Sequence, residues 1–176
     1  MDTRVNTKIF LKTVFLFPLF MIFIMFPLCV LIVITAFLPK GRVLATKLYE
    51  FFGWIGIVLV GVELNIIGAE KIDPKKSYVV IGNHPSTLDI FTHITALPVS
   101  IRFLTKTELF RIPIFGRVLK TLGLPRIDRK NAKANFEKIN DSINQVIKLG
   151  NSIMIFPEGK RSNQKELLPF KKGASH

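Results

Sequence analysis

The residue types best suited to acid–base chemistry stand together at residues 83–89, in the order Asn-His-Pro-Ser-Thr-Leu-Asp. His84 can take a proton from an alcohol if a second group fixes its tautomer and stabilises the imidazolium, and Asp89 can do both. A serine or cysteine nucleophile is not needed if the substrate supplies the hydroxyl. Taken alone, the pair is also typical of a capped helix with a structural histidine, so both interpretations stay open at this point.

Two later segments carry groups that recognise phosphate. Residues 156–162, Phe-Pro-Glu-Gly-Lys-Arg-Ser, combine Glu158 as a hydrogen-bond acceptor, Gly159 for close backbone approach and Arg161 as a cation. Arg129 ends the triplet Ile-Asp-Arg, where its planar fork could bind a phosphate in a bidentate manner. Taken separately, the two segments also fit a polar loop after a strand and a surface ion pair.

Short apolar runs precede these polar segments, which predicts that strands position them. Five segments have the composition or the alternation of strands: residues 62–66, 77–81, 101–104, 124–128 and 152–156. Two others carry a helical pattern: residues 106–122, interrupted by Pro113, and residues 131–149. Ser86 or Thr87 can cap a helix whose first turn holds Asp89. The sequence therefore predicts an α/β fold, a mixed sheet with parallel pairs flanked by helices.

The beginning of the chain is predicted to enter a membrane. Residues 13–38 carry no charge, and a bilayer core requires roughly 20 apolar residues. Pro18 and Pro27 should kink or divide this segment. After a short basic stretch, residues 51–62 are apolar but too short to cross alone. We therefore expect residues 1–61 to form a membrane-embedded helical pair, ahead of a domain at residues 62–176. A secretory signal peptide is the competing interpretation.

The chain is strongly basic, with a formal net charge of +13. Such a charge suits anionic partners, which include nucleic acid, acidic lipid surfaces and phosphorylated substrates. Between Arg102 and Lys133 the basic residues alternate with apolar ones, a spacing that favours a surface against lipid headgroups. Because nucleic-acid motifs are absent, we expect anionic membrane lipids and no nucleic acid as partners. Cys29 is the sole cysteine, which excludes an intramolecular disulfide, and we expect no metal site.

In this order, the segments resemble the sequence blocks of the 1-acylglycerol-3-phosphate (lysophosphatidic acid) acyltransferases, within the glycerolipid acyltransferase superfamily. Residues 83–89 match the first block, the HX4D motif. Residues 106–129 match a second block that runs from Lys-x-Glu-Leu to Ile-Asp-Arg. Residues 156–162 match Phe-Pro-Glu-Gly-Thr-Arg-Ser, except that Lys160 replaces threonine. The resemblance covers about residues 60–173.

The resemblance implies a membrane-bound O-acyltransferase of phospholipid biosynthesis. His84, oriented by Asp89, would act as the general base on the free hydroxyl of lysophosphatidic acid. The alkoxide would attack an acyl thioester of coenzyme A or acyl carrier protein, giving phosphatidic acid without a further cofactor. The glycerol phosphate would be held by the remaining polar positions of the blocks: Lys106, Arg129, Glu158, Gly159 and Arg161.

The acceptor is less closely defined than the reaction. Glycerol 3-phosphate, another lysophospholipid or another lipid would suit the same machinery. The family continues past the third block into a further strand, so a chain ending at His176 is expected to be shortened at its C-terminus, and an inactive lipid-binding relative is a second alternative. The resemblance also implies a membrane location, integral or monotopic, at the cytoplasmic face of the inner membrane if the source is bacterial.

Overall fold

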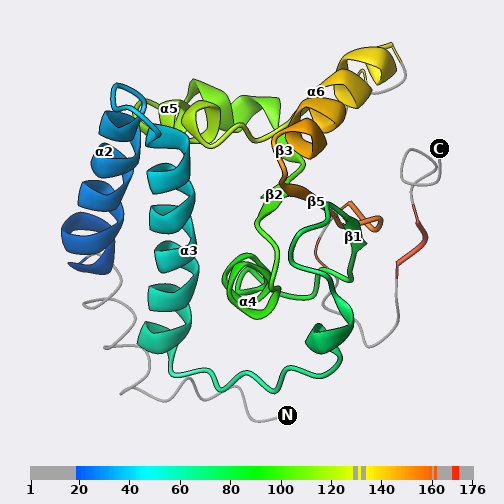
Figure 1. Ribbon diagram of the computed structural model, residues 1–176, viewed down its shortest axis with the longest axis horizontal. Helices are drawn as coiled ribbons and strands as arrows, with labels where there is room; N and C mark the ends of the chain where they lie inside the picture. Colours follow the sequence, from blue (N-terminus) through cyan, green and yellow to red (C-terminus); the bar gives the residue numbers. More distant parts are fainter. Residues whose placement is uncertain (1–18, 129–130, 132–133, 160, 162–167, 171–176) are drawn as a thin grey trace, which may run out of the picture.

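A three-stranded parallel sheet forms the centre of the computed structural model (Figure 1), which describes residues 19–128, 131, 134–159, 161 and 168–170. β1 (Val79–Ile81) and β2 (Ile101–Phe103) both pair with β5 (Ser152–Ile155), which lies between them. A second sheet pairs β3 (Thr105–Lys106) with β4 (Arg126–Ile127), also in parallel. The predicted α/β fold with parallel pairs is confirmed.

Helices join the parallel strands, as such crossovers require. The connecting helices, in chain order, are α4 (Asp89–Ala96), the 3₁₀ helix η3 (Thr107–Arg111), α5 (Phe115–Thr121) and α6 (Phe136–Lys148). A further 3₁₀ turn, η2 (Ala69–Lys71), precedes β1. Pro113 separates η3 from α5, as the sequence predicted, because a proline cannot continue a helix interior.

Two antiparallel helices stand beside this sheet (Figure 1). A π-helical turn, η1 (Met21–Met25), leads into α2 (Phe26–Thr35), with a proline in the first turn of α2, where its missing N–H costs nothing. Lys40 takes a left-handed conformation with φ 58°, and the chain then returns as α3 (Gly41–Val60). The predicted helical pair is therefore present as a unit of structure.

The predicted division of the second member of this pair was wrong. The sequence suggested a short basic stretch followed by a separate apolar helix at residues 51–62, whereas α3 is one helix of 20 residues. Residues 41–60 contain no proline, so nothing interrupts the helix where its composition changes. By length and composition α3 is able to cross a bilayer, and it is the one such helix in the described part of the chain.

The strand predicted at residues 62–66 was also wrong. These residues have no assigned secondary structure and pair with no strand among those the structure describes. Val62 and Leu64 are partly buried and Glu63 and Asn65 are exposed, so burial alternates at first, but Ile66 is exposed like Asn65 before it. A period of two indicates a strand only where a neighbouring strand supplies the hydrogen bonds.

One hydrophobic core joins the helical pair to the sheet. Leu28 and Ile32 of α2 and Tyr49 of α3 belong to the same buried cluster as Ile101 and Met154 of the strands. α3 also packs closely on α4, since a Cβ added at Gly56 would lie 2.1 Å from a ring carbon of Phe91. The division of the chain after residue 61 stays a prediction, but the core continues across it.

Candidate active site

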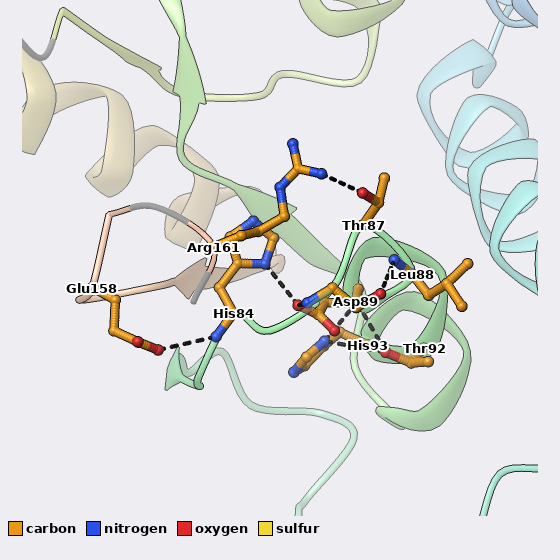
Figure 2. Close-up of polar contacts among 9 residues, drawn as sticks. His84, Thr87, Leu88, Asp89, Thr92, His93, Glu158 and Arg161 are labelled. Carbon is orange, nitrogen blue, oxygen red and sulfur yellow. Dashed lines mark hydrogen bonds and ion pairs between the residues drawn. The ribbon is translucent and has the colours of Figure 1, made fainter. Parts of the chain in front are cut away.

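His84 and Asp89 meet at the carboxyl end of β1 (Figure 2). His84 lies in the loop after the strand, and Asp89 is the first residue of α4. The distance from His84 Nδ1 to Asp89 Oδ2 is 2.7 Å. The same carboxylate oxygen accepts the backbone N–H of Ser86 at 2.9 Å, and the Ser86 hydroxyl accepts the N–H of Leu88 at 3.1 Å. The loop therefore orients the carboxylate, and the carboxylate orients the imidazole.

This contact decides which nitrogen of His84 is available for chemistry. A carboxylate only accepts hydrogen bonds, so Nδ1 of the neutral ring carries the proton and Nε2 keeps its lone pair. Among the described residues Nε2 has no hydrogen-bond partner. The side chain of His84 is 19% accessible. The tautomer of the ring is therefore fixed before substrate arrives. A hydroxyl group that reached Nε2 could donate its proton to that nitrogen.

The phenyl ring of Phe156 packs against one face of the His84 imidazole. The two rings are stacked, with centroids 4.2 Å apart and an interplanar angle of 10°. His93 meets the same phenyl ring edge-on at 5.6 Å, and its Nδ1 donates to the backbone oxygen of Asp89 at 2.6 Å. We did not single out Phe156 from the sequence, although its place directly after β5 was a usable signal. The described contacts of His93 are with Thr92, the backbone of Asp89 and Phe156, and its structural role stays a prediction.

Glu158 connects the third block to the first. Its side chain is buried, with 2% exposure. Oε1 accepts the backbone N–H of His84 at 3.2 Å, and Oε2 accepts the backbone N–H of Leu168 at 3.0 Å. The sequence predicted a contact with substrate, which stays a prediction. The described contacts add a role that sequence reasoning missed, which is to fix the loop that carries His84.

The other predicted site residues differ in whether a described contact joins them to the segment that carries His84 and Asp89. Arg161 donates to the hydroxyl of Thr87, which brings the third block over the first (Figure 2). Gly159 has φ 68°, in the left-handed region that favours glycine. Lys106 ends β3 with an exposed side chain, and no described contact joins it to His84. Arg129 lies outside the described residues, so its predicted phosphate contact stays a prediction.

An apolar cavity of about 170 Å³ lies between the helical pair and the sheet. Its walls include Leu28 and Ile32 of α2, Phe52 of α3, Ile90 of α4 and Phe103 of β2. Ile90 directly follows Asp89 in the chain, and Phe103 is stacked with Phe156 at 5.8 Å between centroids. The cavity is therefore adjacent to the residues that surround His84, and its lining suits a hydrocarbon chain.

Comparisons with known proteins point to one family. The sequence model of the acyltransferase family matches residues 63–176. The chain is 34% identical over 139 residues to a 1-acyl-sn-glycerol-3-phosphate acyltransferase of Cocos nucifera, covering 78% of this chain and 44% of that protein. It is 35% identical over 121 residues to the enzyme of that name from Saccharomyces cerevisiae, covering 68% of this chain and 40% of the yeast protein.

A solved structure is similar along almost the whole chain. It is the crystal structure of the 1-acyl-sn-glycerophosphate acyltransferase PlsC from Thermotoga maritima, with a TM-score of 0.68 and 25% identity. The match covers 95% of this chain and 66% of PlsC. The chain spans less than half the length of the plant and yeast relatives.

Proposed function

Because the chain belongs to the acyltransferase family, we propose that it transfers an acyl chain from a thioester donor to the free hydroxyl of lysophosphatidic acid, giving phosphatidic acid. The observation that carries the proposal is the His84–Asp89 contact of 2.7 Å, which leaves Nε2 without a described partner. The similarity to enzymes named 1-acyl-sn-glycerol-3-phosphate acyltransferase supports this acceptor. The donor is acyl-CoA or acyl-ACP as co-substrate, and the proposed reaction uses no other cofactor.

In the proposed mechanism, His84 Nε2 removes the proton of the acceptor hydroxyl as the oxygen attacks the thioester carbonyl carbon. The C–O bond forms and the C–S bond breaks, and the imidazolium returns its proton to the departing thiolate. Asp89 stabilises the imidazolium while the charge exists, and Phe156 keeps the ring in plane. Since the acceptor itself attacks, the enzyme forms no covalent acyl intermediate.

The acceptor phosphate would lie near the cations of the second and third blocks. Arg161 already crosses to Thr87 at the rim of the His84 loop. A guanidinium there is able to form charge-assisted hydrogen bonds with phosphate oxygens. Arg129 and Lys106 are proposed to complete the phosphate contacts, with Gly159 permitting close backbone approach. Glu158 would contribute by holding the His84 loop, and as an acceptor for a glycerol hydroxyl.

The apolar cavity beside His84 is proposed to receive an acyl chain from the membrane. Each buried CH₂ contributes about 0.8 kcal/mol, so a matching cavity favours a chain that leaves the bilayer only in part. α2 contributes to the cavity wall and also exposes Phe26 and Leu31, and Phe23 of the preceding η1 is exposed as well. This arrangement supports a membrane location with the outer face of the helical pair in lipid.

The packing of α3 favours a monotopic arrangement over a spanning one. α3 contacts the sheet domain near both of its ends, through Thr46 to Arg102 and through Gly56 to Phe91 of α4. If α3 crossed the bilayer, charged parts of that domain would lie at hydrocarbon depth, where each charge costs several kcal/mol. A surface-lying pair avoids this cost.

The direct test of the reaction is His84→Ala in the full chain, assayed with lysophosphatidic acid and either acyl-CoA or acyl-ACP. Loss of the general base should lower kcat by about 10²- to 10⁴-fold. His93→Gln is the matched control, because it removes a neighbouring imidazole that we assign to structure, and we expect a change of less than about tenfold. Equal losses in both variants, with unchanged melting temperatures, would contradict the assignment of the base.

The acceptor and the membrane arrangement need separate tests. A panel of lysophosphatidic acid, glycerol 3-phosphate and other lysophospholipids with one donor should show the highest kcat/KM for lysophosphatidic acid. For the membrane, Cys29→Ser is combined with Lys40→Cys or Glu63→Cys, which lie at opposite ends of α3. An impermeant thiol reagent should label both sites from the same side of sealed vesicles. Labelling from opposite sides would show that α3 spans.

A further inference from the structure

A second cavity, of about 660 Å³, lies away from His84. It is formed by the N-terminal half of α3, the end of α5, the residues leading into β4, and the C-terminal half of α6. Asn151, which directly precedes β5, lines it, whereas Phe156 beside His84 directly follows β5. The cavity is therefore at the amino edge of the sheet and the candidate active site at the carboxyl edge, separated by the length of a strand.

The lining of this cavity is strongly basic. Its charged members are Arg42, Lys47, Glu50, Arg102, Lys120 and Arg126. Five cations thus face one carboxylate, and in the part of the chain that the structure describes none of the five lies within ion-pair distance of an acid. Four of the cations are exposed side chains that come from three different segments of the chain. Such convergence of like charge is unfavourable without a counterion.

Arg102 makes the base of the cavity. It stands in the middle of β2, is 2% exposed, and is thus one of the most deeply buried side chains. Its guanidinium donates to the backbone oxygen of Leu122 at 2.7 Å, to Ser100 Oγ at 2.8 Å and to Thr46 Oγ1 at 2.7 Å. All these acceptors are neutral, so they fix the guanidinium but do not cancel its charge.

A buried cation of this kind is costly unless an anion compensates it. Burial lowers the pKa of Arg102 from its usual value, because loss of hydration disfavours the cation, and the nearby Tyr49 and Glu50 act in the opposite direction without reversing the shift. The neutral acceptors come from α3, from the residue before β2 and from the end of α5, so the guanidinium is fixed before any ligand arrives. A preorganised cation at the base and mobile cations at the rim are the usual components of a phosphate site.

We propose that this cavity, the basic pocket, binds the phosphate group of an anionic ligand at a site separate from the acyl-transfer centre. The proposal concerns residues that take no part in the proposed reaction, so it stands or fails independently of acyl transfer.

The surroundings of the basic pocket favour a phospholipid headgroup as the source of the phosphate. Val43 and Leu149 line the pocket and are exposed, at 59% and 52%. Phe37 and Leu38, in the turn before α3, are exposed too. Apolar side chains beside a cluster of cations suit a ligand that has a phosphate and an adjacent hydrocarbon chain. A soluble phosphate compound would use the cations alone.

The test uses the full chain with two probes: inorganic phosphate, with the protein in neutral detergent, and vesicles of phosphatidylcholine with or without phosphatidylglycerol, with the detergent removed. The pocket variant is Lys47→Gln combined with Lys120→Gln, two exposed residues in different walls. The control variant is Lys71→Gln combined with Lys75→Gln, which removes the same charge on the exposed segment around η2. Each charge-assisted hydrogen bond is worth tenfold or more in affinity, so the pocket variant should bind phosphate at least about tenfold more weakly.

The results decide both the site and the source. Saturable phosphate binding that is weakened in the pocket variant and retained in the control supports the proposal. If the pocket variant also loses the preference for phosphatidylglycerol vesicles, the ligand is a lipid headgroup. If vesicle binding is equal in both variants, the phosphate belongs to a soluble ligand. Equal phosphate binding by the pocket variant and the control variant would overturn the proposal. If the double pocket variant is unstable, phosphate binding is measured for the single variant Lys120→Gln in its place.

Discussion

The two edges of the central sheet hold their polar groups in opposite ways. At the carboxyl edge, His84, Asp89 and Glu158 are connected to one another or to backbone N–H groups by hydrogen bonds of 2.7 to 3.2 Å. At the amino edge, Arg102 donates to neutral acceptors, and it and the four cations around it share the cavity with a single carboxylate, that of Glu50. The first arrangement suits proton transfer, which needs a fixed geometry within the protein. The second suits binding, in which the ligand supplies the missing charge.

Asp89→Asn should have the largest effect and should be confined to the carboxyl edge. An amide does not hold Nδ1 protonated as a carboxylate does, so the imidazole loses both its tautomer and the partner for its positive charge. We expect kcat/KM for acyl transfer to fall roughly 10²- to 10⁴-fold, with little change in melting temperature. Asp73→Asn, in the exposed loop before β1, is the matched control and should retain activity.

Glu158→Gln should lower stability as well as activity. The amide keeps one acceptor for the two backbone N–H groups of His84 and Leu168 and places a donor against the other. A buried unsatisfied group costs about 1–3 kcal/mol, which should appear in the free energy of unfolding. Glu63→Gln, at an exposed position, is the control. A variant that lost activity with unaltered stability would show that Glu158 acts on substrate and not on the loop.

Gly56→Ala should separate the two ends of α3. Alanine improves helix propensity by about 1 kcal/mol, but overpacking against Phe91 costs about 1–3 kcal/mol, so a net loss of up to about 2 kcal/mol is expected. Because Phe91 lies on the helix that begins with Asp89, activity should fall while phosphate binding at the basic pocket is retained. Stability is measured by the melting temperature, activity by acyl transfer, and the basic pocket by its affinity for phosphate. Val58→Ala, on the exposed face of α3, is the control.

Phe156→Leu should produce the smallest change. Leucine keeps the apolar contact but loses the stacking on His84, an interaction worth about 0.5–1.5 kcal/mol. We expect kcat to fall less than about tenfold with KM unchanged, because the ring positions the base and does not touch the acceptor. Phe170→Leu, an exposed phenylalanine in the described C-terminal segment, should leave kcat unaltered. A rise in KM alone would place Phe156 in substrate binding instead.

The sequence predicted the carboxyl edge better than the amino edge for a physical reason. His84 and Asp89 are five residues apart, and a strand followed by a helix is enough to bring them together. The basic pocket combines side chains from α3, β2, α5 and β4, so no local spacing reveals it. Arg102 was counted within a segment expected to face lipid headgroups, yet all three residues of β2 are buried. A strand with neighbours on both faces loses the alternation that exposes a basic residue.

Similar reasoning explains the two errors in the secondary structure. A change from basic to apolar composition at residues 48–51 suggests a break, but α3 continues through it because hydrophobicity and helix formation are separate properties. The alternation at residues 62–66 suggests a strand, but a strand depends on a neighbour that those residues do not predict. In both cases the decisive contacts come from elsewhere in the chain.

The position of β5 between β1 and β2 has a consequence for the order in which this protein can assemble. The ribosome delivers β1 and β2 first, yet neither has its native neighbour until residues 152–155 emerge. The hydrogen bond from His84 to Glu158 joins positions 74 residues apart and must wait for the same event. Long-range pairings of this kind form slowly. The histidine loop is therefore completed only after β5 has paired, so a nascent chain does not carry a formed candidate active site before its sheet is closed.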